Sequence, residues 1–149
     1  MTKTLKVFFF HHEQSAAFAA ITTPNINGNI SCCMVSTGCA STNTITAVLS
    51  AWQDSQPVIF ISGQNFLNET TTFKKKKNIR TYGQQEANII EIIKPITKYS
   101  KMITSPKQIK YELDKALFFA NEKIKGPVWL DIPLDIQNSR IEEKKIKSF

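Results

Sequence analysis

Short apolar runs alternate along this chain with stretches of helical pattern, and this alternation restricts the fold more than any other feature. The apolar runs, which predict strands, lie at residues 5–10, 30–36, 58–62, 97–104 and 127–132. Helical pattern lies between them, at residues 13–20, 44–53, 84–93 and 107–122. Strands that alternate with helices form a parallel sheet covered by helices on both faces. The sequence therefore predicts a single α/β domain built on a parallel sheet.

Proline and polar stretches predict where the elements end. Pro106 is expected at the start of the last helix, and Pro24 is expected to end the first helix early. Residues 65–80 are polar and predict an exposed loop. The charged residues 138–149 predict a frayed tail or the beginning of a linker, so we place the domain at residues 1–137.

The chain is basic, with 19 Lys and Arg residues against 12 Asp and Glu residues and a net charge of +7. The excess is concentrated at residues 74–77 and in the tail, without aromatic residues between the lysines. A nucleic-acid groove needs basic residues spread along one face with stacking rings among them. No nucleic-acid partner is therefore expected.

Neither a membrane nor an oxidising compartment is indicated. No apolar run approaches the roughly eighteen residues of a membrane span, and the first run is too short for a secretory signal. Cys32, Cys33 and Cys39 lack the spacing of a zinc site or of a disulfide framework. These observations predict a reduced, cytoplasmic setting.

Glu13 follows the first apolar run and opens a helix, which places it at the carboxyl end of the predicted sheet. Open α/β proteins bind ligands there, and a desolvated carboxylate has the raised pKa that proton transfer requires. An acidic residue in the first turn also stabilises a helix without any further role. The adjacent His11 and His12 point to opposite faces of an extended chain, so no shared metal ion is predicted.

The turn at residues 37–43 precedes a helix, and its backbone N–H groups could hold a polar ligand. It has neither the spacing nor the lysine of a P-loop. An ordinary capped loop explains the turn equally well, so the turn alone identifies no ligand.

Several segments of the chain follow one another in an informative order. HEQSAAFAA at residues 12–20 is similar to the motif HEQxAAxAA, and TGCASTN at residues 37–43 is similar to SGPGATN. Further matching segments are AWQDSQP at 51–57, FISGQ at 60–64, QQE at 84–86, PITK at 95–98 and GPVWLDIP at 126–133. Together they resemble the N-terminal, pyrimidine-binding domain of thiamine-diphosphate enzymes of the acetolactate synthase type. The resemblance covers nearly the whole chain and implies the α/β fold of that domain.

The resemblance also implies roles for four residues. Glu13 matches a glutamate that bonds N1′ of the cofactor's aminopyrimidine, where proton sharing prepares the cofactor to attack a 2-oxo acid such as pyruvate. The implied reaction decarboxylates that acid and transfers the acyl carbanion to an acceptor. Gly38 and Asn43 match positions near the pyrimidine, and Gln85 matches a glutamine beside the substrate. For Asn43 and Gln85, a helix cap and a surface helix position are equal alternatives.

The chain departs from the family pattern in ways that bear on cofactors. The family domain begins with a strand and a helix that precede the match to residues 5–10, so an exposed sheet edge is expected. Cys39 and Ala40 replace Pro-Gly in the turn. Ile124 stands where the family has an arginine that contacts flavin, which puts FAD binding in doubt. The family holds the diphosphate and magnesium on a separate domain with a GDG…N signature, which this sequence lacks.

The resemblance thus implies half of a shared thiamine-diphosphate site, inactive without a diphosphate-binding domain or subunit in a homo- or hetero-oligomer. Residues 52–55 and 134–137 also resemble enzymes of surface-polysaccharide gene clusters, which leaves a sugar-related acyl transfer open. Two further interpretations stay open. One is a pyrimidine-binding subunit of a two-chain oxo-acid decarboxylase, and the other is a non-catalytic remnant or assembly module.

Overall fold

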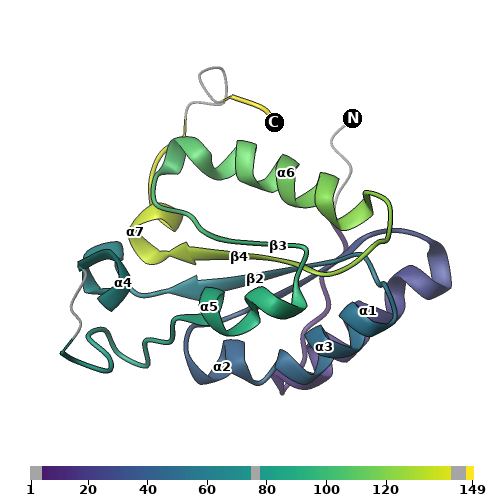
Figure 1. The fold of residues 1–149 in the computed structure, drawn as a ribbon, viewed down its shortest axis with the longest axis horizontal. Coiled ribbons are helices and arrows are strands. Elements are labelled where there is room, and N and C mark those ends of the chain that lie inside the picture. Colours follow the sequence, from purple (N-terminus) through teal and green to yellow (C-terminus); the bar gives the residue numbers. More distant parts are fainter. Residues whose placement is uncertain (1–4, 75–77, 142–146) are drawn as a thin grey trace.

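The computed structural model describes residues 5–74, 78–141 and 147–149, which form a parallel sheet with helices on both faces (Figure 1). Three of the four clustered lysines at 74–77 and part of the charged tail therefore lie outside the described residues. The described residues give four strands in the order β1-β2-β4-β3, all parallel. Their bounds are β1 Ser31–Val35, β2 Val58–Gln64, β3 Tyr99–Met102 and β4 Val128–Pro133. The predicted fold class is confirmed.

The two central strands are almost continuously buried, which is the pattern of strands covered on both faces. Phe60 of β2 and Trp129 of β4 are register partners, and their rings stack with centroids 5.3 Å apart and an interplanar angle of 9°. Aromatic pairs of this kind add to the area that they bury. The centre of the sheet is thus fixed by side chains that the apolar runs already contain.

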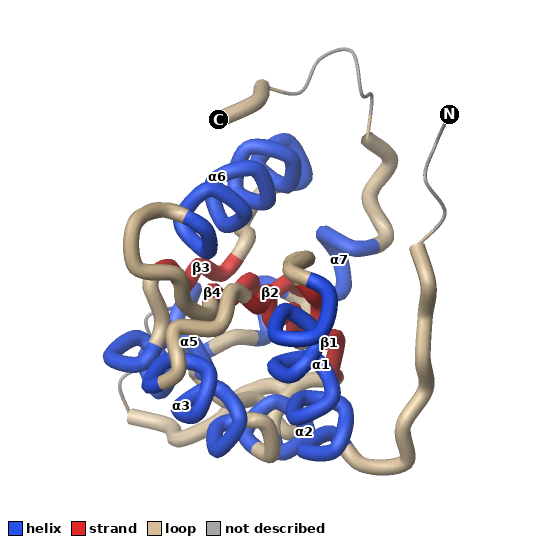
Figure 2. Tube along the Cα trace, turned by 90° about the vertical axis from the view of Figure 1, so that its right-hand side faces the viewer, coloured by secondary structure: helices blue, strands red, loops and turns tan. Residues whose placement is uncertain are grey.

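Helices divide between the two faces of the sheet, as Figures 1 and 2 show. One core layer packs α1 (Glu13–Asn27), α3 (Ile45–Gln53) and α5 (Ile89–Ile93) against the Phe60 face. The other packs α6 (Ile109–Asn121) and α7 (Leu134–Gln137) against the Leu130 face. Shorter pieces are α2 (Cys39–Thr42), α4 (Thr71–Lys74) and 3₁₀ turns at Leu67–Glu69, Lys94–Ile96 and Pro106–Gln108. No helix among the described residues has the length and apolarity to cross a membrane.

The prediction that Pro24 ends the first helix early is wrong. The helix α1 continues through Pro24 to Asn27, and Gly28 closes it in the left-handed conformation, with φ 71°. Proline has no N–H to donate to the carbonyl four residues earlier, which here belongs to Ala20. The Ser31 hydroxyl donates to that Ala20 oxygen at 2.6 Å. A contact from the following strand therefore replaces the hydrogen bond that proline removes.

Three other predictions are corrected. Residues 5–10 are not a strand: no pairing joins them to the sheet, and Phe9 is 94% exposed. An apolar run becomes a strand only when a neighbouring strand pairs with it, and β1 instead stands at the described edge of the sheet. The helix predicted at residues 84–93 begins only at Ile89, because Gln85 has a positive φ of 55° that helical backbone excludes. The predicted loop at 65–80 also contains α4.

Candidate functional site

Two of the predicted site residues contact each other at the carboxyl edge of the sheet. The strand β1 leads through a turn into α2, and Asn43 follows that short helix directly. The Asn43 side-chain amide donates to Glu13 Oε2 at 3.0 Å. Glu13 is half-buried in the first turn of α1, while Asn43 is exposed. The contact orients the Glu13 carboxylate and leaves part of it open to solvent.

The pKa of Glu13 is lowered from its ordinary value, which corrects the expectation of a raised one. The main cause is the Asn43 hydrogen bond, followed by the backbone N–H of Glu13 itself, and together they outweigh a small desolvation. Donors that favour the anion lower an acid's pKa, whereas burial raises it. These hydrogen bonds therefore favour the ionised form of the half-buried Glu13 carboxylate.

The histidine before Glu13 has a structural role. His12 is the N-cap of α1, and its Nδ1 accepts the backbone N–H of Gln14 at 3.2 Å. This satisfies one of the N–H groups that a helix start leaves without an intrahelical partner. Within the described ranges, no group of three His, Cys, Asp or Glu side chains is arranged to hold a metal ion.

The other two predicted residues meet through their backbones. Gly38 is buried and has a positive φ of 62°. A Cβ at this position would lie 2.0 Å from the Gln85 carbonyl oxygen and 2.9 Å from the Gln85 Cβ. Only glycine permits this approach and this backbone conformation together. The β1–α2 turn and the loop at residues 84–88 are therefore fitted against each other at one point.

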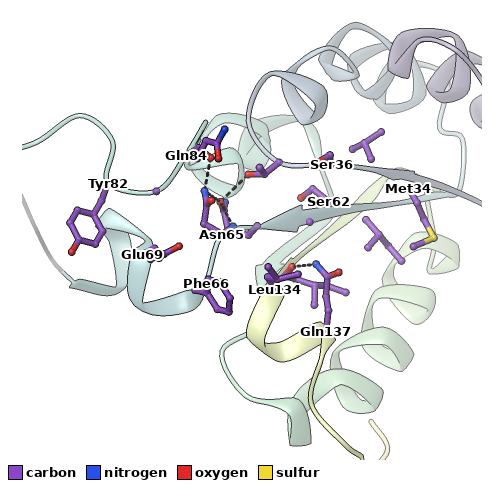
Figure 3. Close-up of a pocket in the computed structure, with 17 residues that line it drawn as sticks. Met34, Ser36, Ser62, Asn65, Phe66, Glu69, Tyr82, Gln84, Leu134 and Gln137 are labelled. Atoms are coloured by element: carbon purple, nitrogen blue, oxygen red, sulfur yellow. Dashed lines mark hydrogen bonds between the residues drawn. The ribbon is translucent and has the colours of Figure 1, made fainter.

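All four residues thus belong to one constellation, in which α2 joins the Glu13–Asn43 contact to the Gly38–Gln85 contact. Two open hollows adjoin it. Glu13 lines a hollow of about 260 Å³ between residues 8–12 and the end of β1. A larger hollow of about 970 Å³ extends from the end of β1 over β2 to α7. In the lining of this larger hollow, Asn65 points toward Gln84 (Figure 3). Neither of these two hollows is lined by Gly38, Asn43 or Gln85.

Sequence reasoning missed a group of buried polar residues beside the larger hollow. Ser62 and Gln64 of β2 line that hollow, and Asp131 of β4 lies behind them, 1% exposed. Burial raises the pKa of Asp131 to about 6, against the opposing effect of its hydrogen bonds from Ser62 and Gln64. The available signal was an acidic residue inside an apolar strand, because such a residue is rarely buried without partners.

Comparisons with known proteins identify the family of this chain. Residues 1–92 match the family model of the thiamine pyrophosphate enzyme, N-terminal TPP binding domain. An acetolactate synthase large subunit from Corynebacterium glutamicum is 35% identical over 133 residues, which are 88% of this chain and 20% of the relative. The chloroplastic acetolactate synthase 1 of Oryza sativa subsp. japonica is 34% identical over 128 residues, 86% of this chain and 18% of the relative.

A third relative shows a similar partial coverage. The probable acetolactate synthase large subunit of Methanocaldococcus jannaschii is 32% identical over 134 residues, which cover 90% of this chain and 21% of the relative. The chain thus spans about a fifth of the length of these curated relatives. The chain belongs to the thiamine pyrophosphate enzyme family, as an N-terminal TPP binding domain of the acetolactate synthase type.

Proposed function

We propose that this chain binds the aminopyrimidine half of thiamine diphosphate in an acetolactate-synthase-like enzyme, with Glu13 as the carboxylate that exchanges a proton with N1′. The observation that carries the proposal is the hydrogen bond from Asn43 to Glu13, 3.0 Å long, at the carboxyl edge of a parallel sheet. Open α/β sheets bind their ligands at this edge.

The residues present fit such a group. The Glu13 carboxylate is oriented on one side and open on the other, beside a hollow. Among the described residues, no Lys or Arg forms an ion pair with it, so it can hydrogen-bond a ring nitrogen. Gly38 leaves the turn without a side chain and lets it pack tightly on the Gln85 loop. When bound, thiamine diphosphate supplies the carbon nucleophile and the electron sink for a 2-oxo acid.

Each residue then has a distinct task. Glu13 would hold or release a proton at N1′, and Asn43 would keep the carboxylate turned toward the ring. Gln85 would face the substrate, which we propose to be a 2-oxo acid such as pyruvate. The lowered pKa makes Glu13 a poor proton donor in the uncovered chain. A partner surface that excludes water would raise this pKa into the range needed for proton exchange.

We propose that the partner surface is a diphosphate-binding domain or subunit that also holds magnesium. The motif for diphosphate and magnesium is missing from the sequence, and the relatives are about five times as long as the matched region. We do not propose FAD as a cofactor, because the exposed Ile124 offers neither charge nor hydrogen bonds to a flavin.

A second candidate function is a non-catalytic assembly module. The observation that favours it is the exposed apolar segment at residues 5–10, together with the edge of β1 that no described strand pairs, where Met34 is 73% exposed. Such surfaces are typical of association sites. This candidate requires no contact between Glu13 and a cofactor.

The test is an NMR titration of the chain with thiamine diphosphate and Mg²⁺. We expect amide shifts at residues 12–14 and 36–44, and at least tenfold weaker binding in Glu13→Gln. The matched control is Glu91→Gln, which alters an exposed glutamate on α5 and is expected to bind normally. Shifts confined to other regions, or equal binding by Glu13→Gln, would contradict the proposal and favour the assembly module.

A further inference from the structure

The buried polar cluster at the carboxyl ends of β2 and β4 has a connected hydrogen-bond pattern. Ser62 and Asp131 are register partners, and the Ser62 hydroxyl donates to Asp131 Oδ1 at 2.5 Å. The Gln64 amide donates to Asp131 Oδ2 at 3.0 Å. The Trp129 indole N–H donates to Ser62 Oγ at 2.8 Å. Both oxygens of the carboxyl group thus accept a hydrogen bond in the sheet interior.

Gln64 extends this cluster to both loops of the candidate site. Its Nε2 also donates to the Ala87 carbonyl at 3.0 Å, two residues after Gln85. Its Oε1 accepts the Thr37 hydroxyl at 2.9 Å, directly before Gly38, and the Asn65 N–H at 3.0 Å. One amide side chain therefore ties the β1–α2 turn to the loop at residues 84–88.

Asp131 is one of the groups that fix the orientation of this amide. A Gln side chain presents a donor and an acceptor that are nearly equal in shape, and its neighbours select the orientation. Because Asp131 Oδ2 and the Ala87 carbonyl both accept, Nε2 must face them, and Oε1 must face Thr37 and Asn65. With Asp131 removed, the amide loses one of the two acceptors that hold it in this orientation.

The two loops that Gln64 joins approach each other closely, and each contains a residue with a positive φ. Gly38 and Gln85 have φ values of 62° and 55°. A Cβ on residue 38 would clash with the Gln85 carbonyl oxygen. Glu86 anchors the 84–88 loop separately, by accepting from Thr71 and from the Tyr82 N–H. The Gln64 bonds are the side-chain hydrogen bonds that join this loop to the turn that carries Gly38.

We propose that Asp131 is a positioning residue, which through Gln64 holds Gly38 and Gln85 together at the carboxyl edge of the sheet. The inference rests on the proposed function only in assuming that the cofactor binds at this edge. The positioning of the two loops is a property of the chain itself. Asp131 lies behind Gln64 and acts through it, so it is not a catalytic residue.

The experiment is NMR of the full chain, with two readouts: the NOE between Gly38 and Gln85, and the backbone order parameters of both loops. In the wild type we expect the NOE and order parameters near about 0.85, the value of a rigid backbone. Asp131→Ala is expected to weaken the NOE at least threefold and to lower the order parameters of residues 37–38 and 84–87 toward about 0.6. The order parameters of α6, on the other face of the sheet, are expected to stay unchanged.

Two further variants separate positioning from a general loss of structure. In Asp131→Asn the amide oxygen can accept from Gln64, and the amide NH₂ group can donate to the Ser62 oxygen. This variant is therefore expected to restore the NOE. Thr37→Val removes only the hydroxyl that reaches Gln64, and it is expected to loosen the same loops by about half as much. Its control is Thr22→Val, which removes an equivalent hydroxyl bond to the Ala19 carbonyl on α1 and should leave both loops unchanged.

Each outcome decides the proposal. The proposal would be overturned if the NOE and the loop order parameters stay unchanged in Asp131→Ala or in Thr37→Val. It would also be overturned if the order parameters of α6 fall as much as those of the loops. If Asp131→Ala does not fold, Thr37→Val and Asp131→Asn decide by the same criteria. The cofactor titration is separate: a chain that fails to bind thiamine diphosphate but shows these loop effects would refute the proposed function and keep the positioning role.

Discussion

Glu13 and Asp131 are two carboxyl groups at the same edge of one sheet, and their surroundings shift their pKa values in opposite directions. Glu13 is partly open to solvent and accepts one exposed amide, so its pKa is lowered. Asp131 is buried behind Gln64 and Ser62, so its pKa is raised to about 6. The chain's own residues thus bury and hydrogen-bond Asp131 on both of its oxygens, whereas they leave the proposed catalytic acid, Glu13, partly open to solvent. We propose that a partner surface completes the environment of Glu13.

The largest expected effect follows from Glu13→Gln in the complete enzyme, with the diphosphate-binding partner, cofactor and Mg²⁺ present. An amide cannot exchange a proton with N1′, so we expect turnover of a 2-oxo acid to fall by about 10²–10⁴-fold. The measurement is carbon dioxide release under saturating cofactor. Glu91→Gln is the matched control. Full turnover by Glu13→Gln would contradict the proposed role of Glu13 in proton exchange.

Removal of Asp131 is expected to destabilise the chain. Asp131→Ala leaves the Ser62 hydroxyl without its acceptor and deprives Gln64 of one of its two. An unsatisfied buried polar group costs about 1–3 kcal/mol, and we expect a loss in this range from urea unfolding. Asp54→Ala changes an exposed aspartate after α3 and should cost less than about 0.5 kcal/mol. Equal losses of unfolding free energy in the two variants would show that the buried hydrogen bonds of Asp131 do not stabilise the chain.

The raised pKa of Asp131 predicts how stability depends on pH. The group binds its proton more tightly in the folded chain, with a pKa of about 6 against 3.8, so its contribution is full below pH 3.8 and lost as pH rises through 6. Between pH 7 and pH 5 its share of the unfolding free energy should rise by about 1 kcal/mol. Asp131→Asn should lack this increment. Identical pH profiles of unfolding for the two proteins would contradict the burial argument.

The smallest expected effect concerns the partner of Glu13. Asn43→Ala removes the main cause of the lowered pKa, so the pKa of Glu13 should move up toward its ordinary value, as ¹³C NMR of the carboxyl carbon can measure. Stability should change by less than about 0.5 kcal/mol because Asn43 is exposed and Glu13 is partly open to solvent. Asn88→Ala, at an exposed asparagine that makes no cap bond, is the control. A Glu13 pKa that does not move would assign the shift to the helix terminus instead.

The sequence predicted the central strands well because their side chains are buried on both faces, as apolar runs indicate. It failed where a distant contact decides the local structure. The helix α1 passes Pro24 because Ser31 satisfies the Ala20 carbonyl, and no local rule contains that contact. Gln85 leaves the helical region of φ in a loop that is fitted against Gly38 and bonded to Gln64. These are tertiary effects that override local preference.

The candidate site was predicted in part for the same reason. Motif similarity indicated Glu13, Gly38, Asn43 and Gln85, and the structure brings these residues into two contacts joined by α2. The direction of the Glu13 pKa was predicted wrongly, because its position after an apolar run does not reveal the hydrogen bond from the distant Asn43. Asp131 was missed because its partners lie more than sixty positions away in the chain.

The most direct test of the central claim is the pKa of Glu13, measured by ¹³C NMR in the free chain and in the same chain saturated with thiamine diphosphate and Mg²⁺. We expect a pKa below the ordinary value in the free chain and a clear rise once the pyrimidine covers the carboxylate. A Glu13 pKa that is the same with and without saturating cofactor would contradict the claim that this carboxylate receives the ring.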